Sequence, residues 1–148
     1  MAKKTKWFAP YVRLRSGAVR CTIDRAAYMR AGVYFIKEVA TGKIVYVGSA
    51  SADLYKTMYR HFQTWTDKSR GRAGWDRTTY PKFGAVKCRI ITCTEKQAAR
   101  WERYYILKLS PRDNPIKYQA LLLSDFKDVP LAVESLEALP PVLNEAPF

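Results

Sequence analysis

The chain has 148 residues, and 48% of them are hydrophobic, so it is long enough to bury a core without disulfide staples. Its three cysteines are too scattered for a disulfide framework or a zinc site, and charged residues interrupt every apolar stretch before it reaches membrane-spanning length. The basic N-terminus also lacks the apolar region of a secretory signal. We therefore expect one intracellular, cytoplasmic domain that is not secreted and has no membrane partner.

The formal net charge is +13, and it is unevenly distributed. Residues 119–148 contain five acidic residues and one basic residue, whereas the other 25 basic residues lie in residues 1–118. A surface of this kind attracts a polyanion and makes binding sensitive to salt. The charge therefore favours nucleic acid as the partner over a basic surface that only keeps the protein soluble.

The first half of the chain predicts two β-hairpins separated by a short helical stretch. Alternating residues around a Ser-Gly turn indicate a hairpin over 11–23. Residues 24–32 are typical of one or two helical turns, with Asp24 as the cap and Gly32 as the stop. β-branched and aromatic residues on both sides of Ala-Thr-Gly indicate the second hairpin, over 33–48.

The second half predicts two helices around a third strand. Apolar residues recur at helical spacing from Leu54 to Trp65, and either Ser51 or Asp53 precedes them as the N-cap. The remaining predicted elements are a long loop (66–84), a strand (85–94) and a helix (95–109) that ends before Pro111.

Short motifs recur on these elements in a fixed order. GVY at 32–34 is followed, after eleven residues, by YVG at 46–48. The helix after the third strand carries the spacing E-x3-I-x4-P-x2-N, at Glu102, Ile106, Pro111 and Asn114. Each motif alone is weak, because glycine and tyrosine are common in strands. Together they resemble the GIY-YIG nuclease family over residues 32 to about 118, and in particular phage intron homing endonucleases and the nuclease half of the bacterial excision-repair incision enzyme.

The resemblance implies an α+β fold, in which a small, mostly antiparallel three-stranded sheet is flanked by helices. We expect a nuclease core over 28–118, preceded by a basic, β-rich extension (1–27) and followed by an acidic tail (119–148). We expect this tail to pack back on the domain or to fold over the basic cleft.

The resemblance also implies roles for five side chains. Tyr34 would activate or orient the attacking water, and because a free phenol has a pKa of about 10, it would need a nearby cation or a second base. Tyr46 would orient the water or the phosphate, and His61 would share proton handling or bind phosphate. Glu102 would hold a single Mg²⁺ or Mn²⁺ ion, and Asn114 would tether the site.

One position departs from the family pattern. Relatives usually carry arginine one helical turn before the position of His61, where this chain has Thr57. Lys56, Arg60 and Arg77 are the candidates to supply the missing cation. Arg60 is preferred to Lys56 because it lies closer to the apolar face of the predicted helix.

We expect contacts with nucleic acid from one glycine, which lets the phosphate approach closely, and from four basic residues. They are Gly48, Lys56, Arg70, Arg72 and Arg77. The predicted loop also contains Trp75, Tyr80 and Phe83, which either stack on bases or belong to a plain surface loop.

The implied reaction is hydrolysis of phosphodiester bonds in duplex or branched DNA with one Mg²⁺-class ion. The alternative is a catalytically inactive nucleic-acid-binding module derived from a GIY-YIG nuclease. The absence of the usual arginine at Thr57 favours this alternative. An interaction protein with an acidic partner is a third hypothesis. No zinc finger or helix-turn-helix is evident, so we expect a stand-alone nuclease of repair, restriction, junction-processing or phage and mobile-element type. Oligomeric state is not readable from the sequence.

Overall fold

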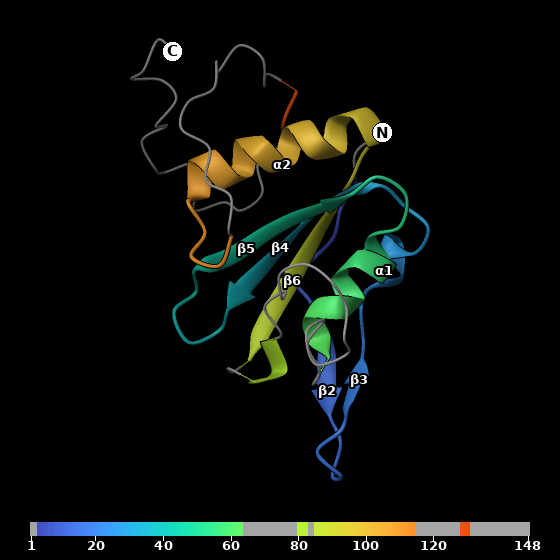
Figure 1. Cartoon of the computed structure of the whole chain (residues 1–148), viewed down its shortest axis with the longest axis vertical. Coiled ribbons are helices and arrows are strands. Elements are labelled where there is room, and N and C mark those ends of the chain that lie inside the picture. Colours follow the sequence, from blue (N-terminus) through green and yellow to red (C-terminus); the bar gives the residue numbers. More distant parts are fainter. Residues whose placement is uncertain (1–2, 64–79, 83–84, 115–127, 131–148) are drawn as a thin grey trace, which may run out of the picture.

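The computed structural model describes residues 3–63, 80–82, 85–114 and 128–130. The strands are β1 (Lys3–Lys4), β2 (Tyr11–Arg13), β3 (Val19–Cys21), β4 (Gly32–Glu38), β5 (Ile44–Ala50) and β6 (Val86–Thr92). The helices are α1 (Leu54–Tyr59) and α2 (Glu95–Leu109), with 3₁₀ turns η1 (Arg25–Ala27), η2 (Arg60–Phe62) and η3 (Tyr80–Lys82). Helix α2 covers one face of the main sheet, and α1 lies against the other (Figure 1).

The main sheet is antiparallel throughout, with the strand order β1-β6-β4-β5. The fold is therefore α+β, as predicted, but the sheet has one strand more than the three expected. The additional strand is β1, in which Lys3 and Lys4 pair with the end of β6. A bridge between Phe8 and Cys88 continues this contact, so part of the N-terminal extension packs on the core sheet. The boundaries 1–27, 28–118 and 119–148 stay a prediction.

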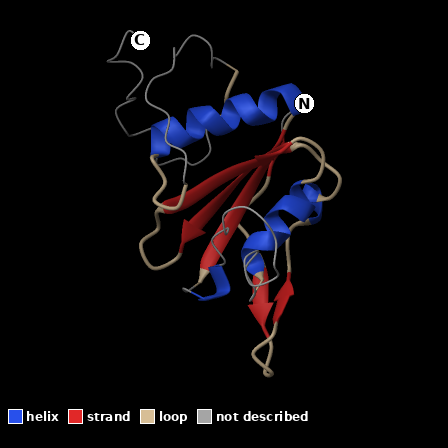
Figure 2. Cartoon of the chain, in the orientation of Figure 1, coloured by secondary structure: helices blue, strands red, loops and turns tan. Residues whose placement is uncertain are grey.

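Two hydrophobic clusters, one on each face, hold the sheet between its helices. Alternate residues of β4 divide between them, because successive strand residues point to opposite faces. Tyr34 and Ile36 pack with α1 on one side, whereas Val33 and Phe35 pack with α2 on the other. The separate hairpin of β2 and β3, predicted over 11–23, extends from the α1 side (Figure 2).

Local signals explain where the two helices begin. Thr94 and Gln97 form a capping box at the start of α2, whose predicted bounds are confirmed. Asp53, rather than Ser51, caps α1 by accepting from the backbone N–H of Lys56 at 3.4 Å. Helix α1 is shorter than predicted, because the chain tightens into η2 after Tyr59.

The predicted helical stretch over 24–32 is reduced to the single turn η1. Asp24 does cap this turn, accepting from the backbone N–H of Ala26 at 2.8 Å. Gly32, however, does not stop a helix but begins β4. A Cβ at that position would lie 2.4 Å from the carbonyl oxygen of Ile91, so only glycine lets β4 and β6 approach this closely.

The three cysteines all lie within the described residues and are free thiols. Within the same described ranges, the helices are all too short or too polar to cross a lipid bilayer.

Candidate active site

The candidate site is organised along the edge strand β5. Residues 46–49 of this strand each contact a side chain that the sequence analysis proposed for the site. These side chains are His61, Asn114, Tyr34 and Glu102, in the order of the strand residues that they contact. Because consecutive strand residues alternate between faces, contacts from the α1 side and from the α2 side meet within this short segment. The side of β5 away from β4 is open to a further contact, since β5 is the last strand of the sheet.

Tyr34 and His61 form a buried hydrogen-bonded pair on the α1 side. The Tyr34 hydroxyl lies 2.9 Å from His61 Nε2, and the two side chains are 1% and 0% exposed. Their rings reach each other because β4 carries Tyr34 beneath the η2 turn that follows α1. The structure thus brings together a phenol and an imidazole that are 27 positions apart in the chain.

Gly48 makes room for the ring of Tyr34, which lies directly opposite it in the β4–β5 pairing. A Cβ on Gly48 would lie 2.3 Å from Tyr34 Cζ and 2.4 Å from its hydroxyl oxygen. Any larger residue would therefore displace the phenol from His61. This gives the glycine of the YVG motif a reason within the protein, while its predicted approach to a phosphate stays a prediction.

Tyr46 completes an aromatic group with the buried pair. Its ring centroid lies 4.6 Å from that of His61 and 6.0 Å from that of Tyr34. Unlike the other two, Tyr46 is only half-buried. Of the three rings it is therefore the one that a molecule at the surface reaches first.

Glu102 approaches β5 from the α2 side, where it contacts Ser49. Burial raises the pKa of the Glu102 carboxyl, and hydrogen bonds from the Ser49 hydroxyl and backbone N–H lower it again without offsetting the burial. Among the described residues, Glu102 forms no ion pair. A partly dehydrated carboxylate without a cation is a position where a cation is favoured.

The donors around Glu102 fit a hydrated divalent ion of the magnesium class. Among the described residues, no group of three or more histidine, cysteine or acidic side chains comes together as a metal site. A closed zinc centre needs several such ligands, whereas Mg²⁺ commonly keeps most of its waters and takes one or two carboxylates. Glu102 is therefore a described carboxylate that could hold such an ion.

Asn114 fastens the open side of β5. Its side-chain oxygen accepts from the backbone N–H of Val47 at 3.0 Å, and its amide donates to the Val47 carbonyl at 2.8 Å. The backbone N–H of Asp113 adds a third bond, to the carbonyl of Val45 at 2.9 Å. These bonds pair the segment after α2 with the edge strand, and they fix the stretch that carries Tyr46 and Gly48.

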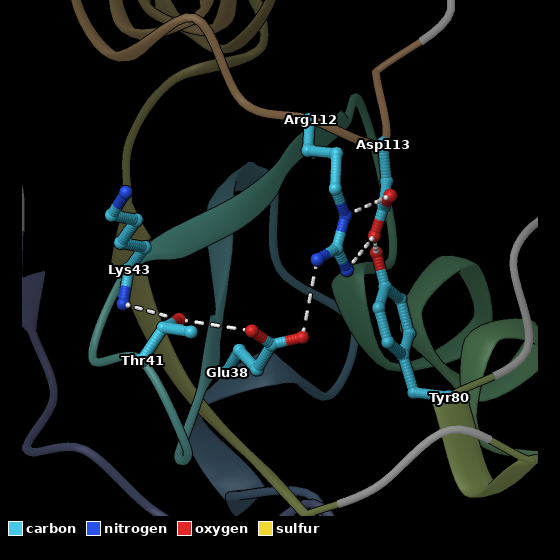
Figure 3. Close-up of polar contacts among 6 residues, drawn as sticks. All are labelled: Glu38, Thr41, Lys43, Tyr80, Arg112 and Asp113. Carbon is cyan, nitrogen blue, oxygen red and sulfur yellow. Dashed lines mark hydrogen bonds and ion pairs between the residues drawn. The ribbon is translucent and has the colours of Figure 1, made fainter.

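Asp113 and Arg112 extend this attachment to other parts of the chain (Figure 3). Arg112 donates to both carboxylate oxygens of Asp113 and to Glu38, at the end of β4. The Tyr80 hydroxyl also donates to Asp113, at 2.9 Å. The contacts thus connect η3, the end of β4 and the segment that holds Asn114.

Tyr80 is a site residue whose position the sequence reasoning missed. It is 2% exposed, and its ring centroid lies 6.0 Å from that of His61. The Tyr80 ring is packed in the core, so of the two alternatives predicted for this segment neither base stacking nor a plain surface loop describes Tyr80. Burial and the neighbouring Asp113 raise its pKa, so the phenol stays neutral. Trp75 and Phe83 lie outside the described residues.

The cation candidates differ in burial. Lys56 is exposed, whereas Arg60 is half-buried with its Nε inside the protein. The Thr57 hydroxyl donates within α1, to the carbonyl of Asp53 at 3.3 Å, rather than to a residue of the site. The burial favours Arg60 over Lys56, in line with the helical-wheel preference. Arg70, Arg72 and Arg77 lie outside the described residues.

The fold is a small α+β domain, with two tyrosines and a histidine on one side of an edge strand and one carboxylate on the other. Residues 30–117 match the family model of the GIY-YIG catalytic domain, which spans more than half of the chain. The chain therefore belongs to the GIY-YIG family, whose members are generally nucleases. No curated protein and no solved structure matched the chain.

Proposed function

We propose that the protein is a metal-dependent endonuclease that hydrolyses phosphodiester bonds in DNA. The observation that carries this proposal is the hydrogen bond between Tyr34 and His61 at 2.9 Å. A phenol alone is a poor base near neutral pH, but a phenol bonded to an imidazole has a neighbour that accepts its proton. The net charge of +13 supports a polyanionic substrate.

The proton path follows from the donors and acceptors of this pair. When His61 Nε2 carries no proton, the Tyr34 hydroxyl donates to it, and the lone pairs of the phenolic oxygen face away from the imidazole. The attacking water gives its proton to that oxygen as the phenolic proton passes to Nε2. His61 ends the step with one proton more, and the water oxygen bonds to phosphorus as the bond to the leaving oxygen breaks.

Glu102 is the residue that would hold the divalent ion. It is hydrogen-bonded to Ser49, which directly follows Gly48 in β5. When bound, such an ion supplies positive charge to the phosphate oxygens and to the leaving oxygen. Burial of Glu102 strengthens any attraction to a cation there, because water screens it less. Ser49 orients the carboxylate through its hydroxyl and backbone N–H.

Tyr46 and Arg60 complete the proposed machinery. The half-buried Tyr46 lies in contact with His61 and offers its hydroxyl to the phosphate or to the water at the surface of the site. Arg60 directly precedes His61 in η2 and supplies the cation that Thr57 lacks. Asn114 acts as a positioning residue through its two bonds to Val47.

The second candidate function is a nucleic-acid-binding module without catalysis. The burial of the pair favours it, since Tyr34 is 1% exposed and reaches a water at the phosphate only if the site opens. The threonine at position 57 points the same way. In that case the basic surface binds DNA, and the aromatic group is only part of the core.

Cleavage of supercoiled plasmid separates the two candidates. With Mg²⁺ present, we expect the protein to nick or linearise the plasmid, and Tyr34→Phe and Glu102→Gln to lose this activity. Tyr104→Phe, which removes a phenol of α2 that has no place in the proposed machinery, is the matched control and keeps it. Salt-sensitive DNA binding without cleavage by the unaltered protein would instead establish the binding module. Duplex, single-stranded and branched DNA then define the substrate.

A further inference from the structure

A second surface feature, away from Tyr34 and Glu102, consists of three tyrosines in a row. Tyr28 follows η1, and Tyr55 and Tyr59 are one turn apart on α1. The ring centroids of Tyr28 and Tyr55 are 6.1 Å apart, and those of Tyr55 and Tyr59 are 6.2 Å apart. We call Tyr28, Tyr55 and Tyr59 the tyrosine track.

The outer members of the tyrosine track are exposed to an extent unusual for aromatic rings. Tyr28 is 65% exposed and Tyr59 is 40% exposed. Met29, the neighbour of Tyr28, is 67% exposed and has a positive φ of 55°, a backbone conformation that non-glycine residues rarely adopt. Large exposed apolar side chains on a strained turn indicate a binding surface more often than a packing role.

The turn that carries Tyr28 is fixed against α1. The carbonyl of Arg30 accepts from the backbone N–H of Leu54 at 2.9 Å, and Asp53 Oδ1 accepts from the backbone N–H of Met29 at 3.1 Å. Tyr28 is therefore held beside Tyr55 by these bonds of the two residues that follow it, and by the bond from its own backbone N–H to the carbonyl of Arg25 at 3.1 Å. A preformed platform loses less entropy on binding than a loop that must first order.

A pocket of about 540 Å³ opens beside Tyr28 and Tyr55. Its described lining includes the cations Lys3, Arg25 and Arg30 and no carboxylate. All three cations are exposed, and none forms an ion pair with a described carboxylate. The volume lies in the range of small-molecule sites, and cations beside aromatic rings match a nucleotide, which joins an anionic phosphate to a flat base.

The tyrosine track leads from this pocket towards the candidate active site. Tyr59 is the last residue of α1, and His61 lies two positions later in η2. A strand that passed from the pocket along α1 would therefore arrive at η2, the turn that carries His61. Bases of a duplex are stacked on each other and cannot stack on side chains, whereas unpaired bases can.

We infer that the tyrosine track and the pocket bind an unpaired strand of nucleic acid, with bases stacked on Tyr28 and Tyr59 and phosphates near Lys3, Arg25 and Arg30. This inference rests on the proposed function in that it names the substrate class, a single-stranded or branched DNA. It makes a separate claim about binding, which is measured without cleavage.

The test uses the full chain carrying Glu102→Gln, so that binding is measured without hydrolysis. Fluorescence anisotropy compares a labelled oligothymidylate, a blunt duplex, and the same duplex with a single-stranded tail. We expect Tyr28→Ala with Tyr59→Ala to weaken binding of the oligothymidylate and the tailed duplex by about tenfold or more, because each stacked base contributes substantially. Binding of the blunt duplex is unchanged.

Two control pairs keep the inference open to contradiction. Tyr28→Phe with Tyr59→Phe retains both rings, so it is expected to bind like the parent. Arg25→Ala with Arg30→Ala is expected to lower the salt dependence of oligothymidylate binding, whereas Lys43→Ala with Lys96→Ala, which removes two charges elsewhere, leaves the pocket intact. Circular dichroism shows that each variant is folded.

Three outcomes overturn the inference. The first is equal binding by the alanine and phenylalanine pairs, and the second is an equal loss of affinity for the blunt duplex. The third is binding of anionic phosphatidylserine vesicles, but not of the oligothymidylate, through the same residues. Ring-dependent strand binding by a protein that never cleaves DNA would support the inference and refute the proposed function. If single-stranded DNA is cleaved equally well with and without the rings of Tyr28 and Tyr59, the proposed function is supported and this inference is refuted.

Discussion

Two carboxylates at the same part of α2 have opposite environments. Glu102 faces β5, where burial raises its pKa and the neutral Ser49 is its hydrogen-bond partner. Asp128 lies against the other side of the helix, where hydrogen bonds from Arg100 at 2.8 and 2.5 Å lower its pKa to about 2. Asp128 is paired with Arg100, whereas Glu102 forms no ion pair with a described residue. This difference supports the proposal that Glu102, and not Asp128, holds the divalent ion.

The contacts of Asp128 also bear on the acidic tail. Trp101 Nε1 donates to Asp128 at 3.1 Å, and the Tyr105 hydroxyl donates to the carbonyl of Pro130. Residues 128–130 therefore pack back on α2, one of the two arrangements expected for the tail. This contact lies on the face of α2 away from Tyr34 and His61, and the rest of the tail lies outside the described residues.

The largest effect is expected on cleavage. Glu102→Gln keeps the shape of the side chain but removes the charge that would hold the ion, so we expect plasmid cleavage to fall by at least about a hundredfold. Asp128→Asn, the matched control at a carboxylate that contacts the same helix, keeps cleavage within about twofold. An equal loss in both variants would mean that the two carboxylates do not differ as described.

The next effect concerns stability in the presence of a chelator. The raised pKa of Glu102 means that the folded protein binds this proton more tightly than the unfolded chain, so the wild type loses stability as pH rises from the unfolded pKa through the folded one. Glu102→Gln lacks this loss and should be more stable at neutral pH by about 0.5–2 kcal/mol. Urea unfolding of the wild type and the variant, at acidic and at neutral pH and with a chelator present, measures this difference in the free energy of unfolding. A variant that is less stable at neutral pH would contradict the burial argument.

Ser49 allows a finer test of the same carboxylate. The Ser49 hydroxyl lowers the pKa of Glu102, so Ser49→Ala should raise that pKa further and move the acidic limb of the pH–cleavage profile to higher pH. At neutral pH we expect a severalfold loss of activity, less than about tenfold, because the backbone N–H of Ser49 remains. An unshifted profile would show that this hydroxyl does not act through Glu102.

The smallest effect belongs to Asp128. Its lowered folded pKa means that its contribution to stability is present above the unfolded pKa and is lost as pH falls towards about 2. The pair is partly exposed, so we expect Asp128→Asn to cost less than about 1 kcal/mol at neutral pH. Wild type and variant should converge in urea unfolding at the acid end. A difference that persists there would have to come from packing instead.

Local sequence signals predicted most of the elements, although α1 is shorter than predicted and the stretch over 24–32 forms only η1. The bounds of α2 follow from Thr94 and Gln97 at its start and from the break before Pro111, all of which act within a few residues. The second hairpin followed from β-branched and aromatic residues around a turn. The family motifs indicated Tyr34, His61 and Asn114, and the structure places Tyr34 against His61 and Asn114 against Val47.

Contacts between distant segments could not be predicted in the same way. The pairing of Lys3 with Thr92 joins residues 89 positions apart, and no local pattern marks a two-residue edge strand. Tyr80 was interpreted as a loop aromatic because its partner, Asp113, lies 33 positions later. The contact between Ser49 and Glu102 likewise depends on how α2 crosses the sheet.

The most direct measurement of the central claim is the thermal shift that Mn²⁺ or Mg²⁺ produces in the wild type, Glu102→Gln and Asp128→Asn. A metal that binds only the folded state raises Tm, whether or not DNA is cleaved. The account predicts an equal rise for the wild type and Asp128→Asn and no rise for Glu102→Gln. An undiminished rise in Glu102→Gln would show that Glu102 is not the carboxylate that holds the ion.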